Sequence, residues 1–246
     1  MDHMLYIGMN AARATQQAQA TAVNNLANAS TTGFRSDFHS LLTSEIAGPG
    51  HASRFNATST ERASNLDAGP IQQTGRDLDI ALQGKGWFAV QDAQGGEAYS
   101  RRGDLQVQAD GRVLNGAGQP VLGENGPLVL PPHSSVTIGQ DGTVSVVPLG
   151  QGANTLATVD RLKLVALDET QVAKGDDGLM RQIDGKPGEP SAAVQVISGA
   201  LEGSNVNAVE AMVDMISLSR TYEMQVKLMA TAKELSDAGT RLMRLE

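Results

Sequence analysis

Apolar positions near the N-terminus repeat at intervals of three and four, which is the spacing of one helix face. These apolar or small residues are Leu5, Gly8, Met9, Ala12, Ala22, Val23 and Leu26. Thr15 and Gln19 interrupt the face, and Gly33 ends it. Only Asp2 and Arg13 carry a side-chain charge between residues 2 and 29. A surface helix normally has a charged outer face, so we interpret this segment as a helix buried in an assembly.

The C-terminal segment predicts a longer helix. Asn207 suits an N-cap, and Glu210 three positions later suits the reciprocal acid of a capping box. Helical spacing then continues through Val209, Met212, Val213, Ile216, Ser219, Tyr222, Val226, Met229 and Ala230. A helix from Asn207 to Glu246 would be about 60 Å long, whereas a compact chain of this size has a radius of gyration of about 18 Å. The helix is therefore expected to project from the body and to need a partner for its apolar stripe.

The middle of the chain predicts strands. Leu78, Ile80 and Leu82 alternate with Asp77, Asp79 and Ala81, which predicts a half-buried strand with the two aspartates on its solvent face. Two segments, 31 positions apart, each place an Asp-Gly turn between alternating apolar residues, which predicts two hairpins. They contain Leu105, Val107, Asp110, Gly111 and Val113, and then Val136, Ile138, Asp141, Gly142 and Val144. Further strands are expected at residues 87–90 and 161–165.

The distribution of proline and glycine divides the chain. All nine prolines lie between Pro49 and Pro190, and 22 of the 27 glycines lie between Gly69 and Gly203. Helix breakers are thus concentrated in the middle. We predict an α+β protein with a helix and turn at 1–35, an extended connector at 36–73, a central all-β domain of hairpins at 74–200, and a C-terminal helix at 201–246.

Composition excludes several classes of function. The 246 residues carry a net charge of −8 without a basic run, so binding of nucleic acid is not expected. Cysteine is absent, which removes disulfides, thiolate metal sites and thiol nucleophiles. No apolar stretch is long enough to span a membrane, and the N-terminus lacks the pattern of a secretory signal. Direct membrane insertion is therefore not expected, and any export would follow a route without signal cleavage.

Candidate catalytic residues are few. His3, His39, His51 and His133 do not have the spacing of a metal site, and no serine lies in a nucleophile elbow. A secreted β-fold hydrolase would require a pair of carboxylates, for which Asp77 with Asp79, or Asp176 with Asp177, are the candidates. These aspartates also fit a solvent face and a turn. We therefore expect no catalytic residue, no cofactor and no metal, and a hydrolase remains the weaker alternative.

Both ends of the chain resemble the terminal signatures of bacterial flagellar axial proteins, the subunits of the rod and hook. The N-terminal signature lies at residues 23–35, in Val-Asn-Asn-Leu-Ala-Asn-Ala-Ser-Thr-Thr-Gly-Phe-Arg. The C-terminal signature lies at residues 203–212 and continues at 220–223. Between them, residues 77–82, 86–88 and 99–103 are similar to the β-domain of rod proteins. The short length and the Asp-Leu-Asp-Ile-Ala-Leu run look most like a proximal-rod protein, with a distal-rod protein as the close alternative.

This resemblance implies a structural subunit and not an enzyme. Its terminal helices would pair as a coiled coil in the inner layer of a helical tube, with the β-domain outside. Its partners would be copies of itself or other rod subunits, and it would reach the periplasm-spanning rod through the flagellar type III export apparatus. Leu5 to Met9 would correspond to a short export motif. A phage-tail or secretion-system tube protein would share the helix and hairpin pattern but not the terminal signatures.

The resemblance also suggests which residues form subunit contacts. Asn24, Asn25 and Asn28 are expected to hydrogen-bond around the helix end, while Gly33 reverses the chain. Phe34 would anchor that turn and Arg35 would pair across an interface. Ser204, Asn205 and Asn207 would cap the second helix. The full set is Leu5, Met9, Asn24, Asn25, Leu26, Asn28, Ser30, Thr31, Gly33, Phe34, Arg35, Ser204, Asn205, Val206, Asn207, Val209, Met212, Ile216, Tyr222, Val226 and Met229.

Overall fold

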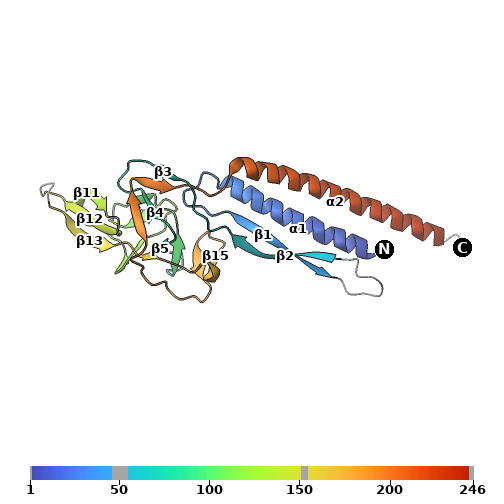
Figure 1. The fold of residues 1–246 in the computed structure, drawn as a ribbon, viewed down its shortest axis with the longest axis horizontal. Coiled ribbons are helices and arrows are strands. Elements are labelled where there is room, and N and C mark those ends of the chain that lie inside the picture. Colours follow the sequence, from blue (N-terminus) through green and yellow to red (C-terminus); the bar gives the residue numbers. More distant parts are fainter. Residues whose placement is uncertain (1, 46–54, 151–154, 244–246) are drawn as a thin grey trace. The chain divides into compact units, whose positions relative to one another are not determined.

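A computed structural model describes residues 2–45, 55–150 and 155–243. The chain forms two compact units (Figure 1). Unit 1 comprises Met1–Ala29, Asp37–Asn65 and Val206–Glu246, and unit 2 comprises Ser30–Ser36 and Leu66–Asn205. Both units are therefore built from segments that are far apart in the sequence.

Unit 1 is a pair of helices with one hairpin. Helix α1 spans Asp2–Ala27 and helix α2 spans Ala208–Met243. The two helices pack along each other in opposite directions, and the hairpin packs against α1. Both helices lie where the sequence predicts them. Among the described residues, no helix is long and apolar enough to cross a membrane.

The hairpin of unit 1 corrects the expected connector at 36–73. Strand β1 (Asp37–Glu45) pairs antiparallel with β2 (Phe55–Ser64), in a register that joins Asp37 to Ser64. Both strands are mostly polar, so apolar alternation did not reveal them. Gly48-Pro49-Gly50, a run of turn-forming residue types between the two strands in the sequence, lies outside the described residues.

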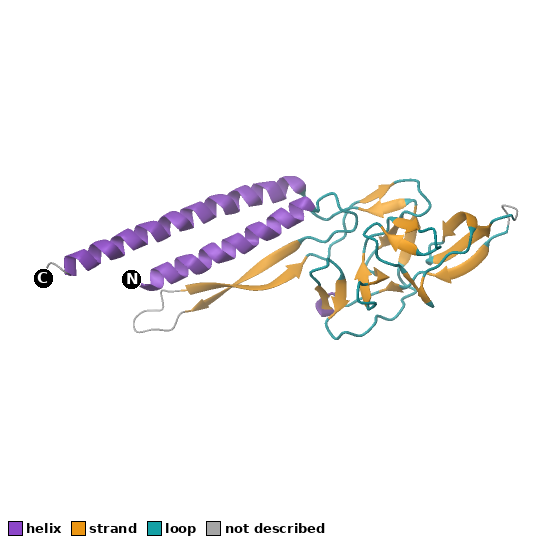
Figure 2. Cartoon of the chain, turned by 180° about the vertical axis from the view of Figure 1, so that it is seen from behind, coloured by secondary structure: helices purple, strands orange, loops and turns teal. Residues whose placement is uncertain are grey.

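Unit 2 consists of short strands joined by loops (Figure 2). Its strands are β3 (Ile71–Gln73), β4 (Ile80–Gln83), β5 (Trp87–Gln91), β6 (Glu97–Ser100), β7 (Leu105–Val107), β8 (Val113–Asn115), β9 (Leu122–Gly123), β10 (Gly126–Pro127), β11 (His133–Ile138), β12 (Thr143–Pro148), β13 (Ala157–Arg161), β14 (Leu164–Val165), β15 (Val172–Lys174), β16 (Met180–Gln182), β17 (Gln195–Ser198) and β18 (Ala200–Glu202). The largest sheet has the order β14-β5-β6-β16-β15, and a three-stranded sheet has the order β11-β12-β13. The described strands also form the pairs β4-β17, β3-β18, β7-β8 and β9-β10. A 3-10 turn covers Glu169–Gln171.

The two hairpins predicted from Asp-Gly turns are present. Strand β7 pairs with β8 and strand β11 pairs with β12. Gly111 and Gly142 have φ angles of +85° and +83°, which glycine adopts without the strain that a Cβ would add. Their inward apolar residues contribute to one core that extends through most of the sheets of unit 2.

Two local expectations differ from the structure. Strand β4 is buried on both faces and not half-buried: Ile80 and Leu82 lie in the core, Ala81 on the other face is also fully buried, and β17 pairs along its edge. Asp79 is accordingly buried, and its carboxylate accepts hydrogen bonds from the Arg76 guanidinium, with 2.8 Å from Nε to Oδ1. The strand expected at 161–165 is divided between β13 and β14, since their partners lie in different sheets.

The core of unit 2 generates a stability prediction. Leu128 is 2% exposed within the core, whereas Leu149 is 65% exposed. Leu128→Ala is expected to lower the free energy of unfolding by about 2–5 kcal/mol, because it removes buried methyl groups and leaves a cavity. The matched change Leu149→Ala should alter it by less than about 0.5 kcal/mol. Urea denaturation followed by Trp87 fluorescence measures both, and equal losses would contradict this description of the core.

Candidate subunit interface and buried ion cluster

Asparagine side chains close the end of α1. The Asn28 N–H donates to the carbonyl oxygens of Asn24 and Asn25, both at 3.1 Å, and Asn28 Nδ2 donates to Asn24 O at 2.9 Å. Asn25 Nδ2 donates to Asp37 O at 2.7 Å, while the Asp37 N–H donates to Asn25 Oδ1 at 2.9 Å. The Asn25 amide thus pairs with the backbone of Asp37 as a neighbouring strand would, and holds the start of β1 beside α1.

The chain then turns at Gly33, within unit 2. Gly33 has a φ of +67°, and its N–H donates to Glu202 O at 2.8 Å. A Cβ on Gly33 would lie 2.5 Å from the carbonyl carbon of Arg101. Both the backbone conformation and the close approach therefore require glycine at this position.

Phe34 follows in the same turn and is half-buried. Its N–H donates to Thr31 O at 3.3 Å, and Lys174 Nζ lies 4.2 Å from the centroid of its ring. Lys174 Nζ also donates to Arg35 O at 2.7 Å. The ammonium group therefore joins a cation–π contact to a backbone hydrogen bond and holds the turn against β15.

Inside unit 2, the buried Glu202 carboxylate joins the end of the N-terminal signature to the strand that directly precedes the C-terminal signature. Arg35 Nη2 lies 2.5 Å from Glu202 Oε1, and Arg101 Nη1 lies 3.0 Å from Glu202 Oε2. The Gly69 N–H donates to Glu202 Oε1 at 3.0 Å. The three charged residues are only 2%, 4% and 1% exposed, in the order Arg35, Arg101 and Glu202. Glu202 thus binds three segments that are distant in sequence.

Trp87 forms a wall of this cluster. The guanidinium carbons of Arg35 and Arg101 lie 5.9 and 5.4 Å from the centroid of its ring. Arg101 Nη2 also donates to Gly84 O at 2.7 Å. Burial lowers the pKa of the Arg101 guanidinium; the Glu202 carboxylate opposes that shift, and the nearby charge of Arg35 adds to it.

The cluster corrects the expectation that Arg35 pairs across a subunit interface. Its guanidinium is already buried and paired within its own chain. Glu202, which the sequence analysis did not single out, is its partner. Glu202 directly precedes the C-terminal signature, and in β18 it lies on the same face as the buried Ala200, two positions earlier. A carboxylate on the apolar face of this strand was the feature of the sequence that could have indicated a buried ion pair.

Asn205 also differs from its expected role as a helix cap. The Ser36 N–H donates to Asn205 Oδ1 at 2.7 Å, Asn205 Nδ2 donates to Asp67 O at 3.0 Å, and the Asn205 N–H donates to Phe34 O at 3.3 Å. Asn205 therefore bonds to two other backbone segments of unit 2, at residues 34–36 and at Asp67. The cap of α2 is Asn207, whose Oδ1 accepts from the N–H of the residues two and three positions later, at 3.1 and 3.4 Å.

The residues predicted for subunit contacts divide by exposure. The exposed ones are Met9, Asn24, Ser30, Asn207, Val209, Met212, Ile216, Tyr222 and Val226. The half-buried ones are Leu5, Asn25, Leu26, Asn28, Thr31, Gly33, Phe34, Asn205, Val206 and Met229, and the buried ones are Arg35 and Ser204. The apolar residues of α2 therefore do not all face the same neighbour. Met229 faces Gly8 of α1, whereas Val209, Met212 and Ile216 face away from the described residues.

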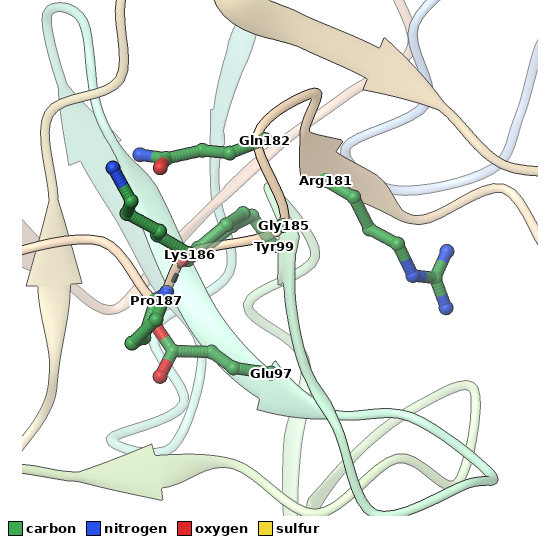
Figure 3. Close-up of a pocket in the computed structure, with 7 residues that line it drawn as sticks. All are labelled: Glu97, Tyr99, Arg181, Gln182, Gly185, Lys186 and Pro187. Carbon is green, nitrogen blue, oxygen red and sulfur yellow. Dashed lines mark hydrogen bonds between the residues drawn. The ribbon is translucent and has the colours of Figure 1, made fainter.

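A cavity of about 290 Å³ lies in unit 2 beside β6 and β16 (Figure 3). Its polar groups are already paired. Tyr99 Oη donates to Glu97 Oε1 at 2.9 Å, Lys163 Nζ lies 2.7 Å from Glu97 Oε2, and Arg181 extends away from Lys186 toward its own carboxylate partners. Because these groups already pair with one another, the cavity does not present the free nucleophile or base that a catalytic site requires.

The carboxylates considered for a hydrolase do not line this cavity or the smaller one beside Leu162. Asp77 is exposed, and Asp177 pairs with Arg181, whose hydrogen bond holds the pKa of the Asp177 carboxyl below its usual range. Within the described residues, no group of three or more metal-ligating side chains could hold a metal ion.

Three family descriptions match the chain. Residues 5–35 match "Flagella basal body rod protein", residues 81–146 match "Flagellar hook protein FlgE/F/G D1 domain", and residues 197–242 match "Flagellar basal body rod FlgEFG protein C-terminal". The matched ends contain α1 and α2, and the matched middle contains much of the core of unit 2. The combination defines the class of flagellar rod and hook proteins.

Curated relatives cover the whole chain. It is 41% identical to the flagellar basal-body rod protein FlgF of Escherichia coli (strain K12), with full coverage of both sequences. Identity to FlgF of Salmonella typhimurium is also 41%, again over both full lengths, and identity to FlgF of Caulobacter vibrioides is 35% over 96% of each chain. The chain belongs to the flagellar basal-body rod protein family and is FlgF-like. The resemblance seen in the signatures is confirmed, and the family is one of structural proteins rather than enzymes.

The buried ion cluster generates a second prediction. Glu202→Gln keeps the shape of the side chain but leaves two buried guanidinium groups without a counter-charge. The free energy of unfolding is expected to fall by about 3–5 kcal/mol. Glu169→Gln is the matched control, because Glu169 pairs with Lys85 at an exposed site, and it should cost less than about 1 kcal/mol. Urea denaturation measures both variants, and a neutral effect of Glu202→Gln would contradict the proposed importance of the cluster.

Tyr99 generates a third prediction, on pH dependence. Burial raises the pKa of the Tyr99 phenol from its ordinary 10 to about 12. The folded protein thus favours the neutral phenol. The contribution of Tyr99 to the free energy of unfolding is therefore full below pH 10 and is lost as the pH rises toward 12. Absorbance at 295 nm should show one late-ionising tyrosine, and Tyr99→Phe should remove that step. A titration curve whose last step survives in Tyr99→Phe would refute the assignment.

Proposed function

We propose that this chain is a proximal-rod subunit that assembles helically through its terminal helices into the shaft between the basal body and the hook. The observation that carries the proposal is an exposed apolar stripe on α2. Val209, Met212, Val213 and Ile216 are 67%, 43%, 62% and 51% exposed and follow the i, i+3, i+4, i+7 spacing of one helix face. Such a stripe is typical of a surface that is covered by another protein.

The stripe is separate from the contact between the helices. The face of α2 toward α1 carries Ala211, Met215 and Met229, which are buried or half-buried. The helix therefore has one apolar face for its own subunit and another without a partner in it. We infer that α1 and α2 pair as a coiled coil and that their outer faces contact neighbouring subunits in an inner helical layer.

Head-to-tail contacts between such faces build an open helical assembly, because nothing requires the rotation between neighbours to close. Other rod subunits, or copies of this chain, are the partners that this arrangement favours. Unit 2 has a continuous core of its own, which suits an outer layer that folds independently of the helices.

We extend the proposal to export. Residues 5–35 match the rod-protein family and carry few charges, which suits delivery as an unfolded N-terminal segment through the flagellar type III export apparatus. Leu5 to Met9 would supply the apolar export motif, and the basal body would be the destination.

A pair of matched substitutions tests the proposal. Ile216→Glu places a charge in the exposed stripe of α2, and Ile183→Glu places one on a 65%-exposed position of unit 2. Both would be expressed in a bacterium that lacks its own FlgF. Ile216→Glu is expected to abolish swimming and to remove the subunit from isolated basal bodies, while the unfolding transition of unit 2 in the purified full-length variant, followed by Trp87 fluorescence, stays unchanged. Ile183→Glu should swim normally.

Normal swimming and normal incorporation with Ile216→Glu would contradict assembly through this face of α2. A loss of secretion rather than of incorporation would show that the stripe acts in export instead.

A further inference from the structure

The contact between α1 and α2 contains a polar pair, in which Thr15 is buried and Gln225 is half-buried. Thr15 is 8% exposed, and its Oγ1 accepts a hydrogen bond from Gln225 Nε2 at 3.0 Å. The Thr15 hydroxyl in turn donates to Ala11 O at 3.0 Å, within its own helix. Thr15 is one of the two residues that interrupt the apolar face of the N-terminal segment, so the interruption coincides with a side-chain hydrogen bond between the two helices.

The rest of this contact provides little to fix one helix against the other. On α2, Gln225 and Met229 contact α1, and they are four residues apart. Continuing the alternating spacing of four and three residues that defines a coiled-coil seam gives the expected seam Ala211, Met215, Leu218, Tyr222, Gln225, Met229 and Ala232. On α1 the same spacing runs through Gly8, Ala11, Thr15, Ala18 and Ala22. Small side chains and flexible methionines pack almost equally well after a shift of one turn.

A shift of that kind would leave the polar pair unsatisfied. If α2 moved by one turn, Gln225 Nε2 would lose Thr15 Oγ1 and face only small or apolar side chains. Gln225 Oε1 already lies buried without a hydrogen-bond partner, so the amide contributes to specificity at some cost to stability. A buried polar residue in an apolar seam is a known means of selecting one register over others.

We propose that the hydrogen bond between Gln225 and Thr15 sets the register of α1 against α2. The register determines which residues of the exposed stripe of α2 lie level with the exposed face of α1. A subunit in the wrong register would present a different surface to its neighbours. This last consequence rests on the proposed function, whereas the register itself does not.

The absence of native cysteine allows a direct test on the purified full chain. A Cβ on Gly8 would lie 3.0 Å from Met229 Cγ, so Gly8→Cys with Met229→Cys reports the observed register by forming a disulfide, which needs Cβ atoms about 3.5–4.5 Å apart. Ala22→Cys with Tyr222→Cys reports a register shifted by one turn, because a seven-residue step from the Thr15–Gln225 pair places Ala22 level with Leu218 in the observed register. Oxidation captures the paired helices even where pairing is short-lived, and non-reducing electrophoresis gives the two initial rates.

In the unaltered background the first disulfide is expected to form much faster than the second. Adding Gln225→Leu should reduce the ratio of the two rates by about tenfold, because an apolar side chain packs in either register. Thr15→Val should act in the same way, while Thr15→Ser keeps the hydroxyl and should preserve the ratio. Gln17→Leu, at an exposed position of α1, is the matched control and should leave the ratio unchanged.

Two results would overturn the proposal. One is an unchanged ratio in both Gln225→Leu and Thr15→Val; the other is equal rates for the two disulfides before any seam substitution. Circular dichroism of each variant establishes that the helices are retained, and replacing a buried polar side chain by an apolar one is not expected to unfold them. Since no assembly takes place in this experiment, its outcome is independent of whether the chain incorporates into a rod.

Discussion

The buried Glu202 carboxylate is the constraint on which the arrangement of unit 2 depends. It neutralises one of two adjacent guanidinium groups, accepts a backbone N–H from Gly69, and lies in the strand that leads to α2. Arg35 reaches it from the segment that follows α1. Burying three charges is favourable only when each is paired and hydrogen-bonded, so the cluster requires the N-terminal turn, the β6–β7 loop and β18 to be in place together. Within unit 2, the segment that follows α1 and the segment that precedes α2 consequently lie side by side, and Asn205 bonds the second to Phe34 and Ser36 of the first.

The two units differ in how completely each satisfies its own side chains. Unit 2 encloses a continuous apolar core, and the carboxylates of Glu202, Glu97 and Asp92 are each paired with a basic side chain within it. Unit 1 covers the face between its helices but exposes Val209, Met212, Val213 and Ile216 on α2, together with Met9 on α1. Apolar burial is the main favourable term in folding, so we expect unit 1 to gain stability when another protein covers these side chains, as the proposed function requires. This asymmetry is what the proposed function requires of a subunit that is delivered alone and becomes ordered in an assembly.

The sequence predicted those features that depend on local periodicity. Both helices, the hairpins at Asp110-Gly111 and Asp141-Gly142, and the cap at Asn207 follow from spacing and turn chemistry, and the structure places them accordingly. It did not predict the β1–β2 hairpin, because polar strands paired through their backbones leave no apolar alternation. It also assigned Arg35 to an interface, since the partner Glu202 lies 167 positions away and only the fold brings them together. The family signatures identified the class of protein, but they did not distinguish a residue that packs within the subunit from one that contacts a neighbour.

The division into a self-sufficient unit 2 and an incomplete unit 1 is tested most directly by amide hydrogen exchange, measured peptide by peptide on the dilute full-length chain. We expect the amides of β5, β6 and β12 to exchange only through rare opening of the core, while those of α2 exchange orders of magnitude faster and become protected in isolated rods. Equal protection of α2 and β5 in the free chain would mean that the helices need no neighbour, and would contradict the account.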